Sequence, residues 1–161
     1  MHARAAITSD VPAIADIYNQ GIEDGIATFE TRPRTAADIE PWLGGRFPVI
    51  VVEDAGRVIA FASTSEYRPR ACYAGIAEFS VYTARAERGR GAGRLAMEVL
   101  IERAAAAGFW KLVSRVFVGN DPSRALLKRV GFREVGIYHR HARLHGVWHD
   151  VVIVERFVGA S

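Results

Sequence analysis

The sequence predicts an α/β fold in which helices flank a mixed, mostly antiparallel central sheet, within a single domain over residues 1–161. Strand-like segments alternate with segments whose apolar residues recur at helical spacing. Short turns join neighbouring strand segments, which favours antiparallel hairpins with one parallel step. A chain of 161 residues fits one domain and can bury a core without disulfides.

The N-terminal part is predicted to contain one strand and two helices. Residues 2–7 have strand character, and Thr8-Ser9-Asp10 offers caps for a helix with Pro12 in its first turn. The apolar positions of that helix are Ile14, Ile17, Tyr18 and Ile22. A second helix begins at Thr35, and Pro41 inside it predicts a bend or a short helix.

Strands dominate the remaining sequence. We expect strands at 49–53, 57–65, 76–83 and 111–118, and helices at about 93–107 and 121–130. The first two of these strands flank a turn and form a hairpin, and Asp121 is the expected N-cap of the last helix. Residues 132–157 are predicted to form two strands broken near Gly146.

Composition narrows the class of protein. Half of the residues are hydrophobic, yet no segment approaches the roughly 20 apolar residues of a membrane span. The N-terminus lacks an apolar signal core, and the single cysteine, Cys72, excludes an internal disulfide, so we expect a cytoplasmic protein without a membrane partner. A net charge of +3 suits a polyanionic cofactor as well as it suits nucleic acid.

A loop rich in glycine and arginine, residues 88–94, lies between a predicted strand and a predicted helix. Its glycines let backbone N–H groups approach an anion, the helix N-terminus favours negative charge, and arginines add charge-assisted bonds to phosphate. The loop therefore predicts a diphosphate site. The alternative is an exposed basic turn. The loop matches neither a Walker loop nor a dinucleotide fingerprint.

This loop, with the preceding Ser80-Val81-Tyr82, the turn Asn120-Asp121-Pro122-Ser123 and the helix exit Arg129-Val130-Gly131-Phe132, resembles the GNAT superfamily of N-acetyltransferases. The resemblance implies the acetyltransferase fold, enzymatic activity and acetyl-CoA as cosubstrate. It implies these cofactor-binding residues: Ser80, Val81, Tyr82, Arg88, Gly89, Arg90, Gly91, Ala92, Gly93, Arg94, Asn120 and Ser123.

The chain further resembles the branch that acetylates phosphinothricin and methionine sulfoximine, which would give resistance to such herbicides or antibiotics. The resemblance rests on Thr28-Phe29, on residues 67–73, on Ala77-Glu78 and on residues 145–151. It implies homodimers and the substrate-binding residues Phe29, Arg68, Arg70 and Tyr73. Arginine is suited to this role because its planar fork binds a carboxylate or phosphinate bidentately.

Glu78 is the candidate catalytic residue. An α-amine is mostly protonated near neutral pH, so a general base must remove a proton before acetylation. Glu78 is the only carboxylate in its strand. The alternative is a carboxylate that merely pairs with a neighbouring arginine.

Other features limit the prediction. The histidines at 139, 141, 145 and 149 lack the ligand spacing of a structural zinc site, so we expect no metal. Leu127 occupies the position where many members of the branch carry a histidine acid, and Tyr138 is a possible substitute.

The sequence leaves the identity of the acceptor open: another amino acid, an arsinothricin-like compound or a protein N-terminus would also fit. A non-enzymatic nucleic-acid binder is a further alternative, which the distribution of aromatic residues disfavours.

Overall fold

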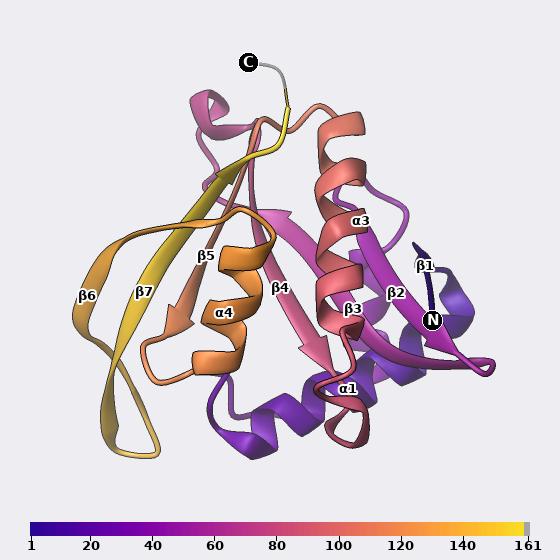
Figure 1. The fold of residues 1–161 in the computed structure, drawn as a ribbon, viewed down its shortest axis with the longest axis horizontal. Coiled ribbons are helices and arrows are strands. Elements are labelled where there is room, and N and C mark those ends of the chain that lie inside the picture. Colours follow the sequence, from indigo (N-terminus) through magenta and orange to yellow (C-terminus); the bar gives the residue numbers. More distant parts are fainter. Residues whose placement is uncertain (160–161) are drawn as a thin grey trace.

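The computed structural model describes residues 1–159, in which one seven-stranded sheet has the order β1-β2-β3-β4-β5-β7-β6 (Figure 1). The strands are β1 (His2–Ala5), β2 (Val49–Asp54), β3 (Arg57–Glu66), β4 (Ile76–Thr83), β5 (Lys111–Phe117), β6 (Arg133–Leu144) and β7 (Val147–Phe157). The helices are α1 (Val11–Asp24), α2 (Ala36–Ile39), α3 (Ala92–Ala106) and α4 (Asp121–Arg129), with single 3₁₀ turns at Thr8–Asp10, Glu40–Trp42, Ala71–Tyr73 and Arg85–Glu87.

The predicted mixed sheet is confirmed. Every neighbouring pair of strands is antiparallel except β4 and β5, which run parallel. These two strands pair only from Ile76 with Lys111 to Glu78 with Val113, and then diverge. Figure 1 shows this divergence, with α4 in front of it. The backbone of β4 beyond Glu78 is therefore released from its parallel neighbour.

Helices cover both faces of the sheet. α3 and α4 pack on one face, where Met97, Leu100 and Leu127 are fully buried with alternate residues of β2 and β3. α1 and α2 pack on the other, where Ile14 and Ile39 contact the residues of opposite parity. This alternation is what a sheet buried on both faces requires.

Two helix starts differ from the predictions. The side chain of Asp10 does not cap α1, because its carboxylate accepts bonds from the Ile7 amide at 2.8 Å and from Arg4 at 2.7 and 2.9 Å. Asn120, rather than Asp121, caps α4, since its Oδ1 accepts from the Ser123 amide at 3.3 Å. The predicted bend at Pro41 is confirmed, as α2 gives way there to a 3₁₀ turn.

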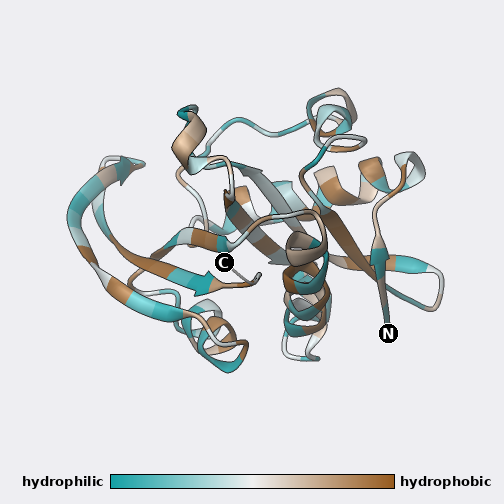
Figure 2. Ribbon diagram, turned by 90° about the horizontal axis from the view of Figure 1, so that it is seen from above, coloured by the Kyte–Doolittle hydropathy of each residue, from teal (hydrophilic) through white to brown (hydrophobic). Residues whose placement is uncertain are grey.

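The hairpin of β6 and β7 curves away from the other strands (Figure 2). It carries side chains that are apolar or aromatic and at least 45% exposed: Val135, Ile137, Tyr138, Val147 and Trp148. The register between the two strands shifts between Tyr138 and Ala142, and Arg140 has a φ of 47°. Asp150 of β7 holds this bulge by accepting from the Arg140 amide at 2.7 Å.

Candidate active site

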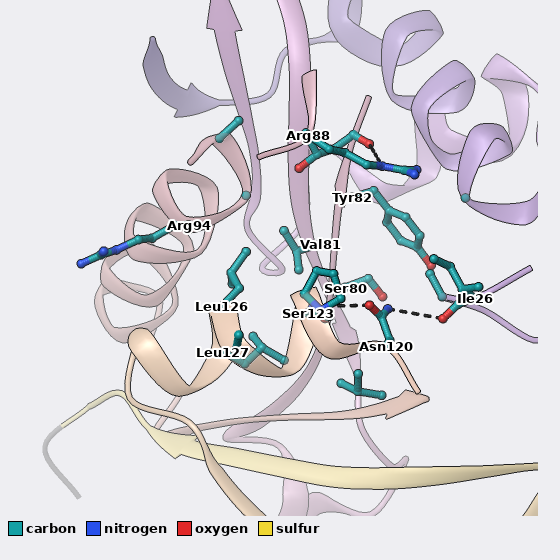
Figure 3. Close-up of a pocket in the computed structure, with 18 of the residues that line it drawn as sticks. Ile26, Ser80, Val81, Tyr82, Arg88, Arg94, Asn120, Ser123, Leu126 and Leu127 are labelled. Atoms are coloured by element: carbon teal, nitrogen blue, oxygen red, sulfur yellow. Dashed lines mark hydrogen bonds between the residues drawn. The ribbon is translucent and has the colours of Figure 1, made fainter. Parts of the chain in front are cut away.

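A cavity of about 800 Å³ opens beside the diverging half of β4 (Figure 3). Its wall is formed by β4, by the loop at 88–93, by the first turns of α3 and α4, and by Ile26 and Ala27. The cavity is therefore bordered by the N-termini of α3 and α4 and by the part of β4 that does not pair with β5. Eleven of the twelve predicted cofactor residues line it, all except Arg90: Ser80, Val81, Tyr82, Arg88, Gly89, Gly91, Ala92, Gly93, Arg94, Asn120 and Ser123.

The backbone of the glycine loop is open toward the cavity. Gly89 and Gly91 have φ values of +82° and +87°, and a Cβ placed on either would meet no protein atom within 4 Å. Gly91 is the N-cap of α3, whose first N–H groups have no partner within the helix. Uncovered amides at a helix N-terminus fit a diphosphate, so the residues present here suit the anionic part of acetyl-CoA.

Gly93 has a different role from the other two glycines. A Cβ at Gly93 would lie 3.0 Å from Leu126 Cδ1 and 3.2 Å from Thr83 Oγ1. The absence of a side chain therefore allows α3, α4 and the end of β4 to pack closely. Gly93 positions the loop rather than forming its open surface.

The three predicted arginines are held by carboxylates. Arg88 lines the cavity and contacts Asp24 of α1 at 2.6 Å. Arg90 instead pairs with Asp54 at 2.7 Å and also with Glu87. Arg94 pairs with Glu98 at 2.8 Å, and Figure 3 shows its side chain directed away from the cavity. Of the three, Arg88 and Arg94 belong to the cavity wall and Arg90 does not.

These ion pairs stabilise the ionised carboxylates. Burial raises the pKa of Asp24, but hydrogen bonds from Arg85 and Arg88 outweigh it and hold that pKa below its ordinary value. The bond from Arg90 lowers the pKa of Asp54 in the same way. The loop at 88–93 is therefore tied to α1 and to β2 by ionic contacts.

The opposite wall joins α4 to the segment after α1. Asn120 Nδ2 donates to the Ile26 carbonyl at 3.3 Å while its Oδ1 caps α4 (Figure 3). Tyr82 is only 9% exposed, and burial raises its pKa above the ordinary value. Asn120 thus closes one end of the cavity, and Tyr82 forms an apolar part of its wall.

Glu78 lies where β4 and β5 separate, next to the wall residues Phe79 and Ser80. Its Oε1 accepts from Arg115 Nη2 of β5 at 2.8 Å, and its side chain is 28% exposed. The ion pair of the alternative interpretation is therefore present. Ser114, beside Arg115, donates from Oγ to the Phe79 carbonyl at 2.9 Å across the gap.

The predicted acceptor residues lie apart from this cavity wall. Phe29 packs against Phe117, with ring centroids 4.7 Å apart. Tyr73 meets Tyr67 edge to face at 5.7 Å, and Arg68 lies over the Tyr67 ring at 4.9 Å. Arg70 is exposed at the start of the 3₁₀ turn Ala71–Tyr73. Within residues 1–159, these four side chains do not converge with Glu78 on one pocket.

The sequence prediction missed Arg115, although a signal was available. It is a cation in a strand that is otherwise largely apolar, three residues after Leu112 and directly before Val116.

Leu127, at the position of the usual acid, is 1% exposed and lines the cavity. Tyr138 lies on the exposed hairpin, 5.1 Å from the ring of His141. No group of three potential metal ligands is present in the part of the chain that the structure describes.

Comparison with known proteins identifies the family. The model of the acetyltransferase (GNAT) family matches residues 14–132. The chain belongs to this family. It is therefore an N-acetyltransferase that uses acetyl-CoA as cosubstrate, as the open loop and the diverging strands indicate.

Individual relatives agree with this assignment. The chain is 32% identical to an L-methionine sulfoximine/L-methionine sulfone acetyltransferase from Pseudomonas paraeruginosa, over 94% of this chain and 91% of the relative. A phosphinothricin acetyltransferase from Sinorhizobium meliloti, solved with acetyl-CoA, superposes with a TM-score of 0.91 at 29% identity, over 98% of this chain and 88% of that one. A ribosomal-protein-alanine N-acetyltransferase from Brucella melitensis gives 0.92 at 32% identity, covering 98% and 99%. Among residues 1–159, no helix has both the length and the apolar character of a membrane span.

Proposed function

We propose that this enzyme acetylates the amine of a small amino-acid-like acceptor, such as phosphinothricin or methionine sulfoximine, with Glu78 as the general base. The observation that carries the proposal is the position of Glu78. Glu78 is the last β4 residue paired with β5, it precedes the wall residues Phe79 and Ser80, and its carboxylate binds Arg115, which lines the same cavity as the glycine loop. The methionine sulfoximine acetyltransferase among the relatives supports this choice of acceptor class.

The chemistry is a direct transfer. The neutral amine attacks the carbonyl carbon of the thioester, the C–S bond breaks, and coenzyme A leaves as a thiolate. Before the attack, Glu78 takes one proton of the ammonium group, directly or through water. The second proton leaves nitrogen as the C–S bond breaks and passes to water. Leu127 has no proton to donate, and a thiol with a pKa of about 8.5 departs tolerably as its thiolate.

The acceptor side is proposed to include Arg68, Arg70, Tyr73 and Phe29, although they lie apart from the main cavity. We further propose a homodimer formed through the exposed apolar side chains of the β6–β7 hairpin, because large apolar side chains at a sheet edge favour association. Sedimentation analysis of wild type and Trp148→Asp tests this proposal, and a monomeric wild type would contradict it.

We also propose a cytoplasmic location and a single acetyltransferase domain over 1–161.

A thiol-release screen tests the acceptor. Phosphinothricin and methionine sulfoximine at millimolar concentration are expected to release coenzyme A and to yield the N-acetylated amino acid by mass spectrometry. Peptides that begin with alanine form the second arm, since a solved relative is a ribosomal-protein-alanine acetyltransferase. Release with the peptides alone would assign the enzyme to protein N-termini. Release with neither, while other amino acids respond, would reject the two named acceptors.

A further inference from the structure

Arg115 is the one cation of β5 that faces the strand divergence. It follows the last residue pair between β4 and β5 by two positions, and it lines the cavity. Its side chain is 49% exposed, yet its guanidinium is bound on one side to the candidate base. Nothing in the transfer chemistry described above uses this residue.

The contacts of Arg115 restrict the carboxylate of Glu78. Arg115 Nη2 donates to Oε1 at 2.8 Å, a length typical of a charge-assisted bond. Within residues 1–159, the other oxygen, Oε2, has no hydrogen-bond partner. One oxygen is therefore fixed, and the other is free to accept a proton from an amine or a water.

A second contact orients the guanidinium itself. Arg115 Nη1 lies 3.4 Å from His141 Nε2, on the bulged part of β6. Nε2 accepts this bond when the imidazole is neutral and carries its proton on Nδ1. The planar fork of arginine can serve both partners at once, which an ammonium group cannot do with the same geometry. Three strands thus contribute to the position of one carboxylate.

We propose that Arg115 is a positioning residue for the general base: it fixes Oε1 of Glu78 so that Oε2 is presented to the acceptor amine. The inference rests on the proposed function, because it takes Glu78 as the base. It goes beyond that function by assigning a role to a residue outside the glycine loop and outside the predicted acceptor loop. A half-exposed ion pair with no such role would contribute little to stability or to rate.

A double-mutant cycle tests the inference, with wild type, Arg115→Gln, Glu78→Gln and the double variant assayed at saturating acetyl-CoA and acceptor. Misplacement of a catalytic group by about 1 Å can cost on the order of 100-fold, so we expect Arg115→Gln to lower kcat by about 10- to 100-fold. In the Glu78→Gln background the same change is expected to alter kcat by less than about threefold, because residues that act together are not additive. The KM for acetyl-CoA stays within about threefold.

Two further variants sharpen the cycle. Arg115→Lys keeps the charge but loses the fork, so it should recover only part of the kcat. Arg57→Gln is the control. Arg57 lies on the β2–β3 hairpin and, like Arg115, is an exposed arginine in an ion pair, here with Glu87 at 3.1 Å, so its loss is expected to leave kcat unchanged. Denaturant unfolding of the four cycle proteins checks that each is folded, so that a lower kcat reflects the active site and not a loss of folded enzyme.

The possible outcomes separate the inference from the proposed function. A Glu78→Gln variant with wild-type kcat would reject the base, and the role of Arg115 with it. A large Glu78→Gln effect with an Arg115→Gln effect below about threefold would reject the positioning role alone. An equal loss from Arg115→Gln in both backgrounds would also overturn it, because Arg115 would then act on the acceptor independently of Glu78.

Discussion

The two ends of the cavity are built in different ways. At the cofactor end, backbone geometry does the work: Gly89 and Gly91 hold left-handed conformations, and the N-terminus of α3 faces the open space. At the end where β4 and β5 separate, side chains from β4, β5 and β6 meet, and the contact between Glu78 and Arg115 spans 37 positions of sequence. A local motif is therefore enough to indicate the open glycine loop, whereas the partners of the candidate base Glu78 depend on how the strands pair.

The largest expected effect on acetyl-CoA binding is at the glycine loop. Gly91→Val should weaken acetyl-CoA binding by about 100-fold or more, because a β-branched residue at this φ is strained and would displace amides that each contribute about 1.5–3 kcal/mol to a charged partner. Calorimetric titration measures the affinity. Gly44→Val is the matched control, since Gly44 has a φ of +82° and equally open surroundings outside the cavity. Unchanged affinity in a folded Gly91→Val protein would reject the cradle.

The contiguous motifs of the cavity could be predicted from the sequence, whereas contacts between residues distant in sequence could not. The glycine loop, the β4 segment and the Asn120 turn are contiguous motifs that were predicted to bind the cofactor, and residues of all three line one cavity. Arg90 was expected there as well but pairs with Asp54, 36 residues away, which no local pattern indicates. The prediction also placed the α4 cap one residue late, at Asp121, because both Asn120 and Asp121 are good capping residues.

The pH dependence of kcat tests whether the leaving thiolate needs an acid, since Leu127 occupies the position of the usual one. With no acid there, the pH profile of kcat should rise through the pKa of the base and then stay flat in the alkaline range. Leu127→Ala should act through packing, with a loss of about 2–5 kcal/mol in the free energy of unfolding, since the side chain is 1% exposed. A downward alkaline limb in folded wild-type protein would show that another group supplies the proton.

The smallest expected effect concerns the ion pairs that tie the cofactor loop to α1. Because the pKa of Asp24 is lowered in the folded state, its pairs with Arg85 and Arg88 contribute stability above the unfolded carboxyl pKa of about 3.9. This contribution is lost as the pH falls through the lower folded value. Asp24→Asn should reduce the free energy of unfolding by about 1 kcal/mol at pH 7.

Thermal or denaturant unfolding at several pH values checks this prediction. The difference between Asp24→Asn and wild type should disappear in acid, whereas Asp16→Asn, an exposed carboxylate on the same helix, should show no comparable difference at either pH. If the free energy of unfolding of Asp24→Asn stays equally far below that of wild type in acid, the cause is steric. The ion pairs of Asp24 would then not stabilise the position of the loop.

Glu78 is proposed to act in transfer and not in acetyl-CoA binding, so the most direct test measures both in one variant. Glu78→Gln keeps the shape of the side chain but removes its basicity. We expect kcat to fall by about 10²- to 10⁴-fold, while the affinity for acetyl-CoA measured by calorimetry stays within about threefold of that of wild type. A fall in kcat of less than about threefold across the pH range, in a folded protein, would contradict this proposal.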